Sequence, residues 1–215
     1  MAFPDDLDKI IPAYLVDGGK NRLKEALEQF APEHRGKVIN YESFYKDYGH
    51  AYFMQADLIK EIRMSIWKEA DAIFDKGYTD AIIISNTCDI SAENEHKANS
   101  KQCLFAPIVD FALYVENLQK DGYSGEKLDQ FIGTVRAQMV SNLFYLPSAH
   151  GVNNEYVVML DRIFWFPVNE LNSYIDEINK NRMASLSHFG YYLFIMKLSY
   201  HLCRLPEQCD RELAI

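Results

Sequence analysis

The sequence predicts an α+β protein, with buried strands in the middle of the chain and amphipathic helices toward both ends. Hydrophobic residues make up 48% of the 215 residues, which is enough for a sizeable core. Short β-branched runs bounded by polar residues, such as 81–85, predict buried strands. Apolar residues spaced three and four apart near both ends predict helices.

The first fifty residues predict a helical N-terminal extension, and residues 51–215 predict the main domain. The extension contains one apolar helical stripe, formed by Leu23, Ala26, Leu27 and Phe30. The following segment, 53–67, fits two patterns. Its apolar residues have helical spacing, whereas 57–59 resembles the start of a strand.

The middle of the chain predicts two strands, 80–85 and 102–109, and Pro107 is expected to end the second of them. The polar loop between these strands is longer than most hairpin loops. Helical spacing at 111–140 then predicts an inserted helical segment, in which Gly122 is expected to end the first helix.

After this insertion, residues 142–147 and 155–167 predict two further strands joined by a turn. The C-terminal third predicts helices at about 168–204. The last helix is apolar nearly all round, so it should be buried on more than one side. Either the N-terminal helices or a second copy of the chain would cover it, and we favour a homodimer. Its histidines, His188 and His201, are expected in the core or at an interface.

The formal net charge of −9 argues against nucleic acid as a partner. The sequence shows no apolar run of 18 residues and no N-terminal signal pattern, so we expect a cytoplasmic protein without a membrane partner. The four cysteines form no CxxC pair, which argues against disulfides and a structural zinc site. No cofactor is expected.

Four pieces of the chain together resemble the PemK/MazF toxin family, namely 55–59, 81–85, 104–109 and 157–163. In this family the corresponding strands form a small SH3-like β-barrel. The resemblance covers about half of the chain. It implies one mostly antiparallel sheet that curls on itself, and five residues are expected to point inward: Ile82, Ile84, Leu104, Val158 and Leu160.

The chemistry of the family is not matched. Its ribonucleases place an arginine just before the strand that resembles 81–85 and a threonine just after the proline of the next strand. Thr79 and Val109 occupy these positions here. We therefore expect an interaction or regulatory module, with a protein partner, that lacks the toxin-type ribonuclease groups. A toxin–antitoxin or defence setting rests on fold analogy alone.

The loop after the first predicted strand is the leading candidate for a binding surface, through Ser85, Asn86, Thr87 and Asp89. Short polar side chains at such a position either bond the loop backbone or bind a ligand. Asp89 is favoured because a carboxylate can order the loop or accept a partner's arginine. In the simplest interpretation, Cys88 packs in the core and its neighbours only brace the loop.

The alternative is an enzyme that uses residues 86–89, either a diverged nuclease or a Cys-dependent hydrolase. Cys88 would be the nucleophile, with His96 or His150 as its base. Metal binding by Cys88, Asp89, His96 and Cys103 has suitable ligand types, but the spacing matches no short zinc motif, so no metal is predicted. Asp161 is a further candidate binding residue, although an aspartate that fixes a turn explains it as well.

Overall fold

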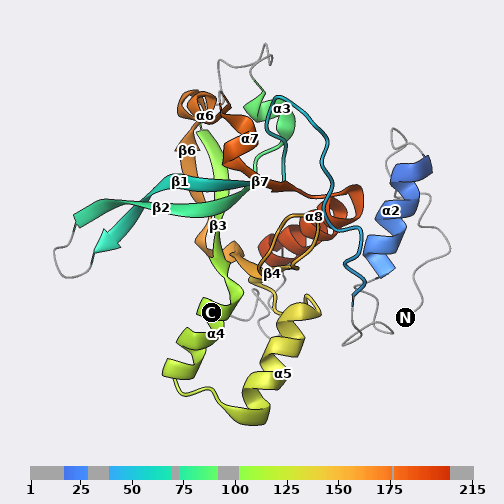
Figure 1. The fold of residues 1–215 in the computed structure, drawn as a ribbon, viewed down its shortest axis with the longest axis vertical. Helices are drawn as coiled ribbons and strands as arrows, with labels where there is room; N and C mark the ends of the chain where they lie inside the picture. Colours follow the sequence, from blue (N-terminus) through green and yellow to red (C-terminus); the bar gives the residue numbers. More distant parts are fainter. Residues whose placement is uncertain (1–16, 29–38, 69–72, 92–101, 176, 204–215) are drawn as a thin grey trace, which may run out of the picture.

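In the computed structural model, residues 17–28, 39–68, 73–91, 102–175 and 177–203 are described. They form a seven-stranded antiparallel sheet with helices around it, so the α+β class is confirmed (Figure 1). The strands are β1 (Asp57–Lys68), β2 (Ile73–Ile83), β3 (Gln102–Asp110), β4 (Leu143–Leu146), β5 (Tyr156–Met159), β6 (Phe164–Pro167) and β7 (Arg182–Ser185).

The strand order is β4-β5-β3-β2-β1-β7, and β6 also pairs with β3. The four pieces that carry the PemK/MazF resemblance therefore all contribute to one antiparallel sheet. The ambiguous segment 53–67 contains most of β1 and is strand, not helix. The sheet is not closed, because β4 and β7 lie at its two ends and do not pair among the described residues.

Two hydrophobic cores lie on opposite faces of the sheet. On one face, helix α8 (His188–Cys203) packs over the strands, with Phe194 in ring contact with Phe144. On the other face lie α3 (Thr87–Ile90), α6 (Val168–Ile175) and α7 (Ile178–Asn181) (Figure 1). Alternation along each strand sends successive side chains into the two cores in turn.

Of the five predicted inward residues, four are buried in the core beneath α8: Ile82, Ile84, Val158 and Leu160. The prediction is wrong for Leu104, which is 43% exposed. Alternation places it on the face of Ala106, but it lies near the start of β3 beside Trp165, which is also exposed.

Strand β3 does not end at Pro107, contrary to expectation, but continues to Asp110. One edge of β3 pairs first with β6 and then with β5, and Pro107 falls between the two pairings. A proline is tolerated where the ladder needs no N–H donor. The predicted strand 155–167 is divided at the same place by the 3-10 turn η2 (Leu160–Arg162).

The predicted helical insertion is present as α4 (Phe111–Lys120) and α5 (Gly125–Arg136). Asp110 caps α4 by accepting bonds from two backbone N–H groups, and Gly122 follows the helix with a φ of +94°. The helices pack on the end of the sheet through a third core, which contains Val135 and Tyr145.

The helical prediction for 168–204 is wrong at β7, which separates α7 from α8 and pairs with the start of β1. Toward the N-terminus, helix α2 (Asp17–Glu28) packs against α8, and Ala26 is fully buried there. Residues 39–50 form a turn at 42–43 and otherwise irregular chain, so within the described residues of 1–50 the predicted helical character is seen in α2 alone. The homodimer remains a prediction.

None of the helices in the described part of the chain is long and apolar enough to cross a membrane.

Candidate functional site

The predicted binding loop is ordered mainly by its own short polar side chains. Asn86 caps α3 by accepting a bond from the N–H of Cys88 at 2.9 Å. Ser85 Oγ accepts a bond from the N–H of Leu104, and Thr87 Oγ1 accepts one from the N–H of Gln55, both at 2.9 Å. These three side chains therefore brace the loop.

The two residues of this loop with reactive groups, Cys88 and Asp89, are both exposed. This contradicts the interpretation in which Cys88 packs in the core; it falls in the first turn of the short helix α3, which projects from the sheet. Cys103 is the buried cysteine, and burial raises the pKa of its thiol to about 12. A thiol in that state is a poor metal ligand.

The other predicted site residues do not gather around Cys88. His96 lies outside the described residues. His150 lies in the turn after β4, where its Nε2 is 3.1 Å from the carbonyl oxygen of Glu42. Asp161 is exposed in η2 and accepts a bond from Asn142 at 3.2 Å, as expected for an aspartate that fixes a turn. Within the described ranges, no three His, Cys, Asp or Glu side chains come together as a metal site.

Two adjoining cavities form what we call the cationic groove, and they lie elsewhere on the molecule. The larger, of about 530 Å3, is lined by 45–47, His150 and β7. The smaller, of about 200 Å3, is lined by Arg22, Lys46, His150 and the start of α8. The cavities share three residues: Tyr45, Lys46 and His150.

The charges around the cationic groove differ in sign from the charge of the whole chain. Among the described residues, Arg22, Lys46 and Arg182 line it together with one carboxylate, Asp47, and the charge of Arg182 is balanced by its ion pair with Asp57. Ser187 caps the N-terminus of α8 there, because its Oγ accepts a bond from the N–H of Gly190 at 3.2 Å. The N-terminus of a helix carries partial positive charge. The net charge of the chain is −9, so this groove is a local exception.

The linking segment, residues 39–56, carries Lys46 into the groove because it runs alongside the start of α8. The N–H of Lys46 donates to the carbonyl of Ser185 at 3.0 Å, and the N–H of Ser187 donates to the carbonyl of Phe44 at 2.9 Å. A Cβ on Gly190 would lie 2.6 Å from that Phe44 carbonyl oxygen. Glycine at 190 therefore permits the close approach.

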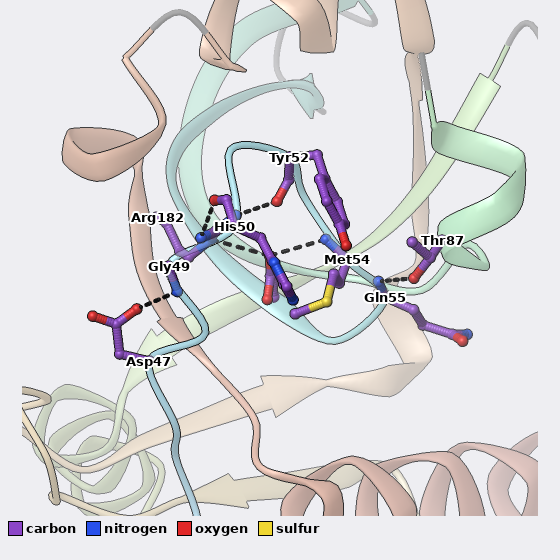
Figure 2. A network of polar contacts seen from close by, with 9 residues as sticks. Asp47, Gly49, His50, Tyr52, Met54, Gln55, Thr87 and Arg182 are labelled. Atoms are coloured by element: carbon purple, nitrogen blue, oxygen red, sulfur yellow. Dashed lines mark hydrogen bonds and ion pairs between the residues drawn. The ribbon is translucent and has the colours of Figure 1, made fainter. Parts of the chain in front are cut away.

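Arg182 fixes the other half of the linking segment by contacts with His50 and Tyr52 (Figure 2), and a buried ion pair with Asp57 holds Arg182. The Nε of Arg182 lies 3.1 Å from Asp57 Oδ2, although its N–H is not aligned for a hydrogen bond. The same guanidinium donates from Nη1 to the carbonyl of His50 at 2.9 Å and from Nη2 to the carbonyl of Tyr52. Asp57 also accepts a bond from the N–H of Met54 at 2.9 Å.

The ion pair of Arg182 and Asp57 orders the linking segment, but it is energetically costly. Burial raises the pKa of the Asp57 carboxyl, even though Ser185, the Met54 N–H and Arg182 all act to lower it. Desolvation therefore outweighs the attraction at this site, as is common for buried ion pairs. The arrangement fixes the backbone between the groove and β1.

Three aromatic rings are stacked along the linking segment at every second residue. Tyr48 and His50 have ring centroids 5.7 Å apart at 4°, and His50 and Tyr52 have centroids 4.8 Å apart at 12°. We call Tyr48, His50 and Tyr52 the aromatic stack. Gly49, between the first two rings, has a φ of +61°, so the alignment does not come from regular extended backbone.

The cationic groove was not predicted from the sequence. Its residues come from α2, the linking segment, the turn before β5 and the region around β7, and no local run of basic residues marks it. His188 is exposed and lines the groove, so the prediction that it lies in the core is wrong, and its place at an interface stays a prediction. Comparison with protein-family models and with curated protein sequences finds no match for this chain.

Proposed function

We propose that this protein is a PemK/MazF-like binding module with a regulatory role, and that its ligand is a small anion held in the cationic groove. The antiparallel sheet that contains all four resembling pieces supports the fold relationship. A register shift between Ile59 and Ile62 in β1 supports it further, because bulges bend strands in the way that barrel curvature requires.

A regulatory role fits better than toxin-type cleavage because of Thr79 and Val109. These residues stand where the family has its catalytic arginine and threonine, and neither can stabilise negative charge on a scissile phosphate as an arginine does. The proposed partners remain a protein or a second copy of this chain, in addition to the small anion.

The charge of the groove is the observation that supports a small anion as the ligand. A positive cavity in an acidic protein attracts anions selectively, because the rest of the surface repels them. A volume of about 530 Å3 is within the range of small-molecule sites. The second, smaller cavity adjoins it at Lys46.

We expect inorganic phosphate, added at constant ionic strength, to raise the melting temperature of the protein, because a ligand that binds only the folded state stabilises it. Lys46→Glu should weaken phosphate binding about tenfold or more, since it reverses a charge in both cavities. Calorimetric titration with phosphate measures the same affinity directly.

The matched control is Lys76→Glu, which makes the same charge change at an exposed lysine of β2. It should leave phosphate binding unchanged. Equal weakening by both variants would show a general charge effect and would contradict a site at the groove. An absence of phosphate binding to the natural chain would refute the proposed ligand class.

The second candidate function is the enzyme that uses residues 86–89, and the exposure of Cys88 favours it. If Cys88 is a nucleophile, iodoacetamide should modify it near pH 7 much faster than it modifies Cys203, which is also exposed. Mass spectrometry of the labelled cysteines compares the two rates. Equal rates would exclude an activated thiol.

A further inference from the structure

We propose that two copies of the chain pair through the outer edge of β1, antiparallel to each other and with the two Ile66 residues face to face. This inference rests on the part of the proposed function that names a second copy as a partner, and it assigns that copy a surface. It does not depend on the anion.

Strands β1 and β2 extend beyond the rest of the sheet as a two-stranded ribbon (Figure 1). Among the described residues, β7 pairs with β1 only at 57–59, and β3 pairs with β2 only at 80–83. We call 62–68 and 73–79 the ribbon. A two-stranded ribbon is only marginally stable in water by itself, and its outer edges present backbone N–H and C=O groups on which another strand can pair.

The strand pairing shows which backbone groups the outer edge of β1 presents. The carbonyl of Ile83 points toward the β1 side, where it accepts a backbone N–H at 2.9 Å. Successive residues of a strand alternate in direction, so Gly77 also turns its N–H and C=O toward β1, where it pairs with Met64. Met64 is therefore bonded to β2, and its neighbours along the outer edge, Ser65 and Trp67, turn their N–H and C=O away from β2.

Helix α6 determines where the open part of this edge begins. The Oη of Tyr174 donates to the carbonyl of Glu61 at 3.1 Å, and the N–H of Arg63 donates to the same hydroxyl group. These two contacts cover the edge as far as Arg63. The open part of the described edge is therefore 64–68, and Ile66 lies at its centre.

A two-fold axis at Ile66 makes this open stretch complementary to itself. It places 64–68 of one copy opposite the same five residues of the other copy in reverse order, so each residue has a partner. Ser65 of each copy then forms a hydrogen-bonded pair with Trp67 of the other, which gives four backbone hydrogen bonds. The two Ile66 residues form the close, non-hydrogen-bonded pair at the axis.

The side chains along this edge favour such a contact. Residues 64–67 are Met-Ser-Ile-Trp, without the charge or proline that commonly protects an exposed edge strand. Ile66 is 43% exposed, so pairing removes apolar surface from water. The adjacent charge, on Arg63, is balanced by an ion pair with Glu170 of the same chain. Two such edges can therefore approach without strong repulsion.

The outer edge of β2 is less suited to a second copy. Its stretch within the ribbon, 73–79, has Lys76 at the centre, so the same two-fold arrangement would place two lysines directly opposite each other. Like charges in that position destabilise a sheet. The difference selects β1. A contact of five residues on each side is small, so the dimer should be weak and concentration-dependent.

The first test is disulfide crosslinking in a chain in which Cys88, Cys203 and Cys209 are replaced by serine. Ile66→Cys should form a disulfide-linked dimer under mild oxidation, because the Cα atoms of a non-hydrogen-bonded pair lie about 4.5 Å apart. Ser65→Cys is the matched control. Its two copies would lie on a diagonal of about 7–8 Å, beyond disulfide reach, so it should crosslink about tenfold or more slowly. Equal rates at the two positions would overturn the inference.

The second test is sedimentation equilibrium of the chain with its natural cysteines in reducing buffer. Ser65→Pro removes an N–H that β2 does not use, so the monomer should stay folded by circular dichroism, while the dissociation constant of the dimer should rise about tenfold or more. Ser65→Ala keeps the N–H and should leave this constant unchanged. A natural chain that remains monomeric at about 100 μM would overturn the inference.

A dimer that Ser65→Pro leaves intact would also overturn it, because the second copy would then lie on another surface. The anion site is tested separately. The described residues that line the cationic groove include none from the ribbon, so Ser65→Pro should leave phosphate binding unchanged. Loss of the edge contact and loss of the anion site are therefore distinguishable.

Discussion

Replacing Arg182 with alanine should lower the free energy of unfolding by about 3–5 kcal/mol, because the substitution leaves the Asp57 carboxylate buried without its counter-charge. Asp57 is only 1% exposed. The variant also releases the carbonyls of His50 and Tyr52, so the linking segment loses its ties to β7. Denaturant unfolding followed by circular dichroism measures the loss.

Arg162→Ala is the matched control, since Arg162 is exposed in η2 and its loss should change stability by less than about 0.5 kcal/mol. The double variant Asp57→Ala/Arg182→Ala provides a second check. It should cost clearly less than the sum of the two single variants, because no buried charge is left unpaired. Additive costs would contradict the direct coupling of Asp57 with Arg182.

Lys197→Met should stabilise the protein by about 1–2 kcal/mol at pH 7. Lys197 is 2% exposed on α8, and its Nζ donates to the carbonyl of Gln138. Burial lowers the pKa of this lysine from 10.5 to about 8. At about 1.4 kcal/mol for each pKa unit, that shift corresponds to about 3 kcal/mol against the charged form. The lost hydrogen bond to Gln138 offsets about 1–2 kcal/mol of the gain.

The pH dependence of the Lys197 variant follows from the direction of the shift. Between about pH 8 and pH 10.5 the unfolded chain binds more protons at Lys197 than the folded protein does, so the natural chain gains stability as the pH rises through this range. The advantage of Lys197→Met should therefore be largest below pH 8 and disappear toward pH 10.5. Urea unfolding at pH 7 and at pH 10 measures both values.

The control for this variant is Lys120→Met, at an exposed lysine near the end of α4. Its effect on stability should be small and nearly independent of pH over the same range. A Lys197→Met protein that is less stable than the natural chain at pH 7 would show that the bond to Gln138 outweighs the cost of the buried charge.

Local sequence patterns correctly predicted the strands and helices that have a clear apolar pattern or a clear stop residue. The β-branched run at 81–85 gave a strand that is buried on both faces, and Gly122 follows the end of α4 as its sequence position suggests. Strand β7 could not be found in this way, because 182–185 has neither length nor alternation. Its strand conformation comes from pairing with β1, which is a tertiary effect.

The candidate site was less predictable than the fold for a related reason. The loop at 85–89 attracted attention because its polar residues are consecutive, yet Ser85, Asn86 and Thr87 turn out to brace local backbone. Lys46 and His150 meet only after folding. No local pattern around either residue indicates that the two lie close together in the folded chain.

The long-range ties of the linking segment also determine the order in which the chain can be assembled. Arg182 and its partner carbonyls are about 130 residues apart in sequence. During synthesis from the N-terminus, β1, β2 and β3 can pair with one another as soon as they emerge, because each follows its partner closely. Gln55 can already bond Thr87 at that stage, but the bonds of Lys46, His50 and Tyr52 to β7 must wait until β7 has left the ribosome. The cationic groove and the aromatic stack are thus among the last parts of the protein to form, and a nascent chain truncated before residue 182 has neither in its final shape.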